Sequence, residues 1–138
     1  MAIEQGTTNT KVALFSREGS LEYFASKEQT QIYPKPGWVE QDPIEIWQNV
    51  KACIKEVIKI SNVNVNKIDS IGVTNQRESL VVWDKETGTP LHNVIVWQDR
   101  RSSKLVDNLK KEYADLIKEK TGLVPDAYFT GPKPMHPA

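Results

Sequence analysis

The chain has 138 residues, with 18 basic and 18 acidic side chains and a formal net charge of zero. This length is enough for one domain with its own core, and the balanced charge argues against nucleic acid as the main partner. No apolar run is long enough to span a bilayer and no signal-like segment starts the chain, so we expect no membrane partner. The single cysteine, Cys53, excludes an internal disulfide and fits a reducing, cytoplasmic location.

The first part of the chain predicts three strands in an antiparallel meander. Ala2–Ile3 is a short apolar start, Val12–Phe15 is suited to a central strand, and Leu21–Lys27 is a third extended run. Arg17–Ser20 has the residues of a tight turn. We therefore expect these three strands to pair in sequence order.

A polar turn rich in threonine lies between the first two predicted strands. Gly6 lets the backbone approach a ligand closely, and Thr7, Thr8 and Asn9 supply polar groups beside the positive charge of Lys11. Such a turn can cradle phosphate oxygens, although most threonine-rich turns after a strand are only turns. It is not a P-loop, because the second glycine and the Gly-Lys-Ser/Thr ending are absent.

A loop stiffened by prolines, with Trp38 expected to anchor it, leads to a predicted helix. Asp42 is placed to cap the helix, Pro43 suits the first helical position, and Glu45 stands where a capping-box acid belongs. Apolar residues then recur at helical spacing, which predicts a packed core and not a cofactor site. They are Trp47, Val50, Ile54, Val57 and Ile58.

A polar segment joins two predicted strands in the middle of the chain. Ile71 and Val73 predict a short buried strand, and Leu80–Trp83 is a second apolar, strand-like run. Arg77 and Glu78 lie between them. The segment has two interpretations. It is either a solvated turn with a weak surface ion pair, or a binding segment in which the guanidinium and the carboxylate form hydrogen bonds to the hydroxyl groups of a polyol.

The last third of the chain predicts a hairpin turn, a buried strand and a second helix. Asp84–Gly88 is the turn and Val94–Trp97 the strand. Asp99 or Ser102 can cap the helix, and Gly122 ends it. Its apolar face, with a break expected near the tyrosine, consists of Leu105, Leu109, Tyr113, Leu116 and Ile117.

Trp97 stands where the predicted strand stops and the helix approaches. A tryptophan at a strand end is usually part of a core, and it can also form an apolar wall against the carbon side of a polyol. The residues alone leave both readings open.

Taken together, these segments resemble the glycerol kinases of the FGGY family of carbohydrate kinases. The matching segments keep the family's order from Ala2 to about Gly131, and two of them, Tyr-Pro-Lys-Pro-Gly-Trp-Val-Glu and Asn-Gln-Arg-Glu, are highly specific. The segments are Gln5–Thr8, Gln31–Glu40, Thr74–Glu78, Ile95–Arg101, Thr121–Leu123 and Tyr128-Phe129.

The resemblance implies an α/β fold of the ribonuclease H-like, actin-like ATPase class, with a mixed sheet and flanking helices, in truncated form. It implies phosphorylation of glycerol to glycerol 3-phosphate, with ATP and Mg²⁺ as cofactors, and it allows an oligomer. The glycerol-binding residues that it implies are Arg77, Glu78, Trp97 and Tyr128. The nucleotide-phosphate turn that it implies is Thr7, Thr8, Asn9 and Lys11, with Glu4 as the metal-binding carboxylate.

The chain also departs from the family pattern. Glu4, Asn9 and Lys11 stand where the family has Asp, Ser and Arg. We expect the chain to begin inside the family's first strand and to lack both the downstream aspartate that serves as general base and the ATP-binding domain. The isolated chain is therefore expected to be inactive, with no catalytic residue of its own. Residues 1–131 are expected to form a partial kinase domain, and 132–138 a non-matching, proline-rich tail without helix, from a truncated or frame-shifted reading frame.

Three functions remain open from the sequence. The first is the N-terminal part of an ATP-dependent glycerol kinase, and the second is a non-catalytic polyol-binding fragment. The third is a kinase for another sugar of the same family. The Asn-Gln-Arg-Glu run and Trp97 favour glycerol over a larger sugar.

Overall fold

The computed structural model describes residues 1–135, which form two compact units. The first unit contains Met1–Gln31 and Gln41–Gln76, and the second contains Ile32–Glu40 and the chain from Arg77 onward. Part of the predicted tail, residues 136–138, lies outside the described residues. Among residues 1–135, no helix combines the length and the apolar character that crossing a membrane requires.

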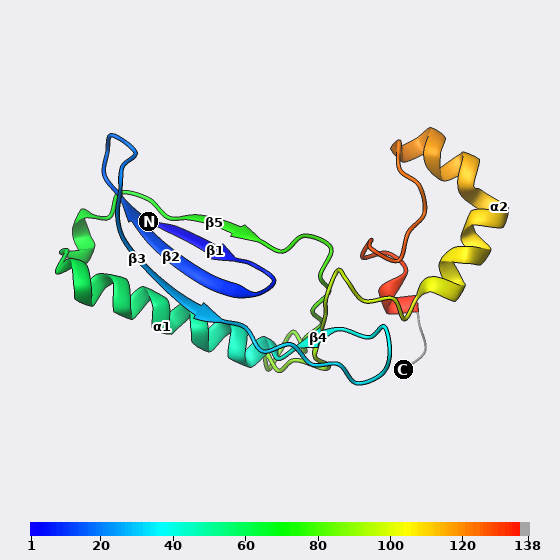
Figure 1. Cartoon of the computed structure of the whole chain (residues 1–138), viewed down its shortest axis with the longest axis horizontal. Helices are drawn as coiled ribbons and strands as arrows, with labels where there is room; N and C mark the ends of the chain where they lie inside the picture. Colours follow the sequence, from blue (N-terminus) through cyan, green and yellow to red (C-terminus); the bar gives the residue numbers. More distant parts are fainter. Residues whose placement is uncertain (136–138) are drawn as a thin grey trace. The chain divides into compact units, whose positions relative to one another are not determined.

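A four-stranded mixed sheet organises the first unit (Figure 1). The strands β1 (Ala2–Gln5), β2 (Asn9–Phe15) and β3 (Leu21–Glu28) pair antiparallel in sequence order, as the sequence predicted. The strand β5 (Gly72–Asn75) pairs parallel with β1, so the order is β3-β2-β1-β5. The parallel pair becomes possible because a helix connects the meander to β5.

The helix α1 (Pro43–Ser61) starts and ends where its sequence signals lie. The Asp42 side chain accepts a hydrogen bond from the backbone N–H of Ile44, which satisfies one donor of the first turn. Asn62 ends the helix in the left-handed conformation, with φ of 51°. A short 3-10 helix, η1 (Val65–Lys67), follows before the chain enters β5.

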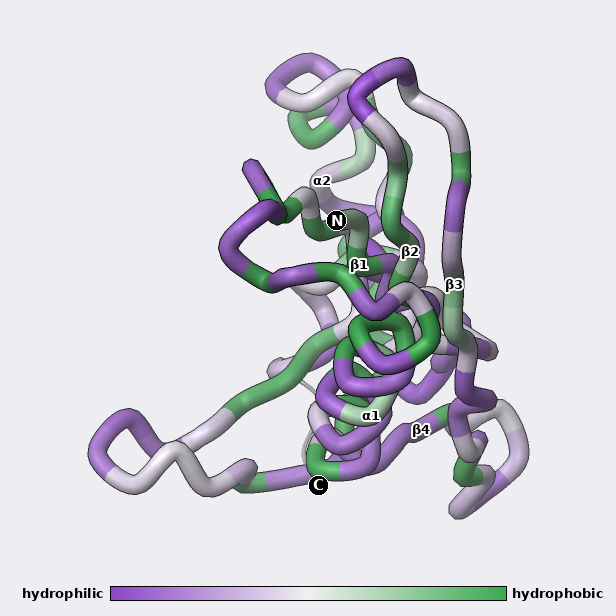
Figure 2. The backbone as a smooth tube through the Cα atoms, turned by 90° about the vertical axis from the view of Figure 1, so that its left-hand side faces the viewer, coloured by the Kyte–Doolittle hydropathy of each residue, from purple (hydrophilic) through white to green (hydrophobic). Residues whose placement is uncertain are grey.

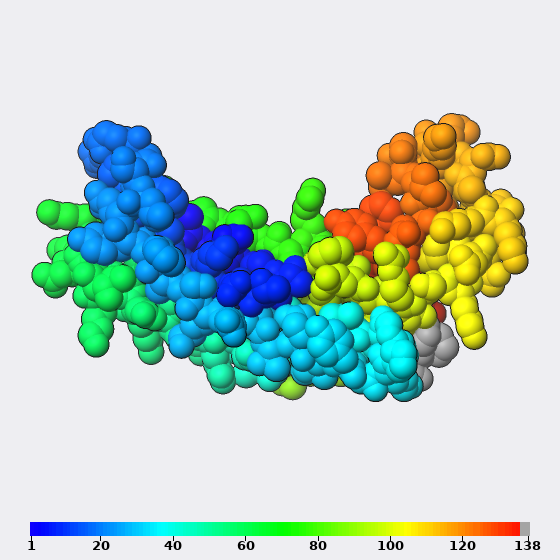
Figure 3. Space-filling model, viewed as in Figure 1, coloured from blue at the N-terminus to red at the C-terminus, as the bar shows by residue number. Residues whose placement is uncertain are grey.

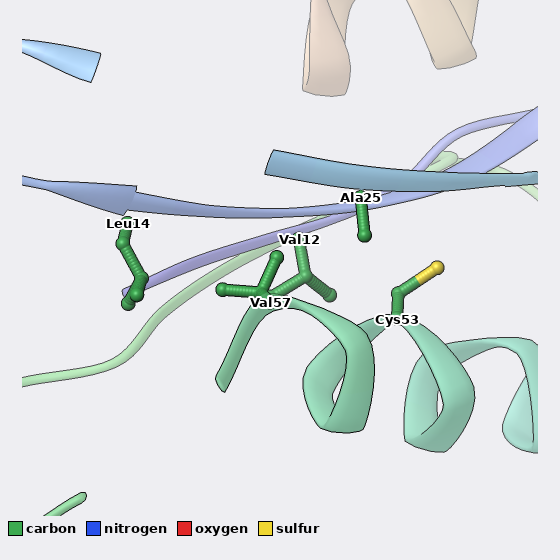
Figure 4. Close-up of a cluster of buried hydrophobic side chains, with 5 residues drawn as sticks. All are labelled: Val12, Leu14, Ala25, Cys53 and Val57. Carbon is green, nitrogen blue, oxygen red and sulfur yellow. The ribbon is translucent and has the colours of Figure 1, made fainter. Parts of the chain in front are cut away.

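The core of the first unit lies between α1 and one face of the sheet. Figure 4 shows side chains of β2 and β3 facing two side chains of α1. Figure 2 shows hydrophobic and hydrophilic residues mixed along α1, and its two buried residues, Cys53 and Val57, lie four residues apart, at helical spacing. The buried cluster consists of Val12, Leu14, Ala25, Cys53 and Val57.

Several apolar residues that the sequence placed in the interior are exposed instead. Trp47 is 57% exposed, and Lys51 lies over its ring at 5.4 Å. Ile71 and Val73 are 60% and 70% exposed. The prediction of a buried strand was wrong because, within residues 1–135, β5 is an edge strand of this sheet and pairs only with β1.

The second unit is built around short strand pairings. The strand β4 (Glu40–Gln41), whose first residue belongs to this unit, pairs with β6 (Val94–Ile95). The predicted strand Leu80–Trp83 is reduced to isolated bridges, in which Leu80 pairs with Ile95 and Trp83 with Pro90. Among the described residues, the run Leu80–Trp83 therefore makes bridges to Ile95 and Pro90 without forming a strand of its own.

The helix α2 (Ser103–Thr121) is continuous, without the predicted break near the tyrosine. Ser102 is its N-cap but makes no side-chain cap bond, and Gly122 ends it with φ of 73°. The chain then folds back (Figures 1 and 3), and Lys133 of the 3-10 helix η2 (Lys133–Met135) interacts with the charges of Asp99 and Arg100, just before α2. The segment predicted to lack helix thus contains one short 3-10 turn, while the proposed boundary at Gly131 stays a prediction.

Candidate functional site

Two aromatic side chains that the sequence singled out lie against each other in the second unit. The rings of Trp97 and Tyr128 have centroids 5.7 Å apart and meet edge to face at 71°. Phe129 packs on the other side of Tyr128, with centroids 5.1 Å apart. Both Trp97 and Tyr128 are half-buried, so they present an apolar surface that is still accessible. The Ser79 hydroxyl oxygen accepts a hydrogen bond from the backbone N–H of Trp97 at 3.2 Å and fixes the end of the strand.

Glu78 is hydrogen-bonded to Thr130, which lies two residues after Tyr128. Its Oε2 accepts hydrogen bonds from the backbone N–H of Thr130 at 2.7 Å and from the Thr130 hydroxyl at 2.9 Å. These bonds, the backbone one first, lower the pKa of the Glu78 carboxyl below its ordinary value of 4.5. Within residues 1–135 both hydrogen bonds reach Oε2, which leaves Oε1 able to accept from a ligand. We call Glu78, Trp97 and Tyr128 the carboxylate–aromatic cluster.

The backbone of Glu78 is strained, which indicates that the surrounding contacts hold it. Its φ is 66°, in the left-handed region that non-glycine residues rarely adopt. Arg77, the neighbouring residue in the chain, is exposed, and its positive charge contributes to the low pKa of Glu78. The structure therefore brings three of the four predicted residues together through the segment 126–130 and leaves the Arg77 side chain beside them in solvent.

A buried lysine lies under the segment that carries Tyr128. The Nζ of Lys133 donates hydrogen bonds to the carbonyl oxygens of Ala127, Tyr128 and Phe129 at 3.2, 2.5 and 2.9 Å. Burial lowers the pKa of Lys133, and the negative charge of Glu78 is the largest of the opposing effects. The ammonium group thus replaces water for three consecutive carbonyl groups.

A buried ionic network lies in the same unit as the cluster. Arg101 makes ion pairs with Glu40 at 2.6 Å and with Asp99 at 2.9 Å, and its guanidinium stacks 3.8 Å from the ring centre of Trp38. Asp99 also accepts from the backbone N–H of Val39 at 2.7 Å. Burial raises the pKa of Glu40, but hydrogen bonds from Arg101 and from an asparagine outweigh it and lower the pKa. Asp99, predicted as a helix cap, serves this network instead.

The threonine-rich turn lies in the first unit, between β1 and β2. The N–H of Gly6 donates to the carbonyl oxygen of Asn9 at 2.9 Å, and a Cβ at Gly6 would lie only 3.0 Å from that oxygen. The Thr8 hydroxyl donates to Asn9 Oδ1 at 2.8 Å. The turn is therefore tight enough to require glycine at its first position.

Two glutamine side chains hold this turn through hydrogen bonds to its backbone. Gln31 Nε2 and Gln41 Nε2 donate to the carbonyl oxygen of Thr7 at 2.9 and 2.6 Å. Gln41 Oε1 in turn accepts from Gln76 Nε2 at 2.7 Å. Because Gln41 is completely buried, these hydrogen bonds are made away from water and are costly to lose.

The two predicted charged residues of the turn form an exposed pair. Lys11 Nζ lies 3.4 Å from Glu4 Oε2, and both side chains are about half exposed. In the described part of the chain, no group of three or more His, Cys, Asp or Glu side chains is arranged to hold a metal ion. Glu4 thus has Lys11 as its observed partner, and its role as a metal ligand stays a prediction.

Three residues that support these sites were not identified from the sequence. Lys133 lay in the segment regarded as a non-matching tail. Arg101 ended a matching run without a role, and Gln41 lay just after another matching run. The sequence did contain a hint for Arg101, which lies shortly after a predicted strand and two residues after Asp99. A charged residue that is buried near a strand end needs an opposite charge as its partner. Nothing in the spacing indicated that Gln41 reaches Thr7, because that contact joins distant segments.

The sequence matches known proteins over almost its whole length. The profile of the N-terminal domain of the FGGY family of carbohydrate kinases matches residues 1–134. The glycerol kinase of Borreliella burgdorferi (strain ZS7) is 52% identical over 136 residues, which are 98% of this chain and 27% of that protein. The glycerol kinase of Solidesulfovibrio magneticus is 51% identical over 134 residues, 96% of this chain and 27% of that protein. The chain thus spans about a quarter of the length of these curated relatives.

Solved structures with the same architecture include enzymes for different substrates. A glycerol kinase of Plasmodium falciparum with ADP superposes with a TM-score of 0.88 at 39% identity and covers 95% of this chain and 26% of that one. A xylulose kinase of Rhodospirillum rubrum gives a TM-score of 0.85 at 26% identity and covers 95% of this chain and 27% of that one. The sequence identity is higher to the glycerol enzyme than to the pentulose enzyme.

Proposed function

The chain belongs to the FGGY family of carbohydrate kinases, and on this premise we propose that it is the N-terminal, glycerol-binding part of an enzyme that phosphorylates glycerol with ATP. The observation that supports this most is the carboxylate–aromatic cluster, in which Glu78 is bonded to the segment that places Tyr128 against Trp97. The relatives that share half of its residues are named glycerol kinase. The activity of the whole enzyme is part of the proposal.

The cluster has the chemistry that a small polyol needs. A polyol bound away from water requires an ionised acceptor and charged donors for its hydroxyl groups, and an apolar surface for its C–H groups. Glu78 Oε1 is the acceptor, the exposed guanidinium of Arg77 supplies the donors, and the Trp97 ring is the apolar surface. The Tyr128 hydroxyl is a further contact. A site of this kind rejects molecules that lack the matching hydroxyl groups.

The threonine-rich turn is the proposed contact for the nucleotide phosphates. Thr7, Thr8 and Asn9 provide backbone and side-chain donors, and the hydrogen bond from Gly6 to Asn9 closes the turn that presents them. Lys11 adds positive charge, and Glu4 is the proposed Mg²⁺ ligand. When bound, Mg²⁺ neutralises charge on the transferred phosphoryl group. The proposal assigns no general base to this chain, so the isolated chain binds without catalysing transfer.

The proposal also covers the ligands, the location and the assembly of the full-length enzyme. Glycerol and ATP are the small-molecule partners, and we propose a cytoplasmic enzyme, in line with the single free thiol of Cys53. The zero net charge gives no reason to expect nucleic acid as a partner. An oligomer of the full-length enzyme is compatible with these residues.

Titration of the purified chain with glycerol tests the proposal, with circular dichroism to show that the chain is folded. The Arg77→Ala variant is expected to weaken glycerol binding about tenfold or more, because one charged hydrogen-bonded contact is worth about 1.5–3 kcal/mol. Arg17→Ala is the matched control, since Arg17 is exposed in the first unit and pairs with Asp69. No saturable binding of glycerol by the folded wild-type chain would contradict the proposal.

Two further measurements separate the alternatives. A kinase for another sugar would require tighter binding of a pentulose such as xylulose than of glycerol, so both ligands are titrated under the same conditions. A coupled assay for glycerol 3-phosphate distinguishes a binding fragment from an active enzyme. We expect binding of glycerol without turnover.

A further inference from the structure

The last described segment contains a lysine whose three donors are all used inside the protein. Lys133 is 1% exposed, and its Nζ contacts the carbonyl oxygens of Ala127, Tyr128 and Phe129 at 2.5 to 3.2 Å. An ammonium group has three N–H donors, so its capacity matches these three consecutive carbonyls. Such a match requires the segment to curve around the nitrogen atom.

The curved segment carries one half of the carboxylate–aromatic cluster. Tyr128, whose carbonyl oxygen receives one of the three bonds, has its ring 5.7 Å from that of Trp97. Thr130, two residues further along, donates both hydrogen bonds to Glu78. The position of the ammonium group therefore fixes the two contacts through which the segment meets the rest of the cluster.

The charges around Lys133 explain how a buried cation is tolerated at this place. Glu78, Asp99 and Asp126 favour its charged form, and Arg100 opposes it. Burial alone lowers the pKa of Lys133, and Glu78 counteracts this most. The carboxylate of the cluster and the buried ammonium group thus stabilise each other's charge.

We propose that Lys133 is a positioning residue of the substrate site, which holds the segment 127–130 so that Tyr128 faces Trp97 and Thr130 binds Glu78. The identity of the substrate as glycerol rests on the proposed function, whereas the arrangement of the cluster does not. Lys133 itself does not touch the ligand in this proposal, because its three donors are occupied by carbonyl groups.

A lysine that only stabilises the fold would behave differently from a positioning residue. Loss of a general stabiliser lowers the stability of the whole unit and leaves the site intact in the molecules that remain folded. Loss of a positioning residue disturbs the cluster in a chain that is still folded. The test therefore needs a signal from the cluster itself.

The indole N–H resonance of Trp97 in the full 138-residue chain gives this signal. The chain has four tryptophans, and the Trp97→Phe variant identifies the resonance by its disappearance. The variants to compare are Lys133→Met, which keeps the side-chain bulk without the charge, and Lys133→Ala. Lys104→Met is the matched control, because Lys104 is an exposed lysine of α2 in the same unit.

We expect Lys133→Met to keep its far-UV circular dichroism, to shift or broaden the Trp97 resonance, and to raise the dissociation constant for glycerol about tenfold. Propylammonium, which replaces the missing atoms, is expected to restore the resonance in Lys133→Ala. Tetramethylammonium, which has no N–H donors, is expected to have no effect. Lys104→Met is expected to match the wild type.

An unchanged Trp97 resonance and unchanged glycerol affinity in Lys133→Met would overturn the proposal. A general loss of helical signal in both Lys133 variants would overturn it as well, because it assigns the lysine to overall stability. If the wild-type chain binds no glycerol, the proposed function fails, and the Trp97 resonance alone then decides whether Lys133 arranges the cluster.

Discussion

The threonine-rich turn of the first unit and the carboxylate–aromatic cluster of the second are held by different kinds of interaction. Neutral amides of Gln31 and Gln41 hold the turn through the carbonyl oxygen of Thr7. Charged groups hold the cluster: Lys133 beneath Tyr128, and the Glu78 carboxylate on Thr130. Hydrogen bonds between amides do not titrate, whereas bonds to a carboxylate depend on its ionisation.

The difference indicates how each site tolerates substitution. A buried charge that loses its partner costs more than a buried amide that loses one hydrogen bond. The second unit is therefore expected to be the more sensitive to single substitutions and to pH. Substitutions in the two units are expected to test this difference in sensitivity, from the largest loss of stability to the smallest.

The largest effect is expected for Arg101→Met. This change leaves the buried carboxylates of Glu40 and Asp99 without their cation, and breaking such a pair from one side costs about 3–5 kcal/mol. Urea unfolding followed by circular dichroism measures the loss. The neighbouring Arg100→Met is the control, because Arg100 and its partner Asp126 are about half exposed and such a pair is worth at most about 1 kcal/mol. Equal losses for the two variants would contradict the assignment.

A smaller effect is expected for Gln41→Leu in the first unit. The change removes the donor to Thr7 and the acceptor of Gln76, which costs about 1–3 kcal/mol in urea unfolding. The amide resonance of Gly6 is expected to shift, because its N–H bond to Asn9 closes the same turn. Glycerol affinity is expected to stay at the wild-type value. A glycerol affinity that falls with the Gly6 shift would break the contrast between the two sites.

The pH dependence of the cluster follows from the low pKa of Glu78. A carboxyl whose pKa is lower in the folded state contributes stability that is complete above its ordinary value, here 4.5, and is lost as the pH falls below it. We expect the Trp97 resonance to change as the pH drops below this value. Thr130→Val, which removes the hydroxyl donor to Glu78, is expected to move the change to higher pH. A pH profile unaffected by this substitution would exclude Glu78 as the titrating group.

The smallest effect is expected for Lys11→Met. Its ion pair with Glu4 is about half exposed on both sides and 3.4 Å long, and pairs of this kind contribute at most about 1 kcal/mol to stability. Urea unfolding at low and high salt measures the change. A decrease of more than about 1 kcal/mol in the free energy of unfolding would show that charged groups also stabilise the first unit, so that the two sites would not differ in this way.

Much of the fold was predictable from the sequence. The ribonuclease H-like, actin-like class and the N-terminal FGGY domain are confirmed by the matches to family members. The meander of β1, β2 and β3, the capped start of α1 and the glycine at the end of α2 are also confirmed. These features depend on local signals, because a cap, a turn and an alternating strand are encoded within a few neighbouring residues.

Burial was predicted less well. Ile71 and Val73 were expected inside because they are β-branched and apolar, but β5 is the edge strand. Trp47 has the spacing of the core face of α1, yet the buried helix residues are Cys53 and Val57. Composition and period indicate which residues can be buried, and the neighbours of an element decide which of them are.

The residue types of the candidate site were visible in the sequence, since the Arg77-Glu78 pair and Trp97 stood out by their chemistry and by family resemblance. The tertiary structure alone decided what holds them: Lys133 reaching three carbonyl groups, Thr130 binding Glu78, and Gln41 reaching Thr7. The Thr130–Glu78 and Gln41–Thr7 contacts join segments far apart in the chain, where spacing carries no information. The Lys133 bonds are local in sequence, but they require the backbone to curve around a buried nitrogen atom. A buried hydrogen bond depends on distance and direction in space, and only the folded chain fixes both.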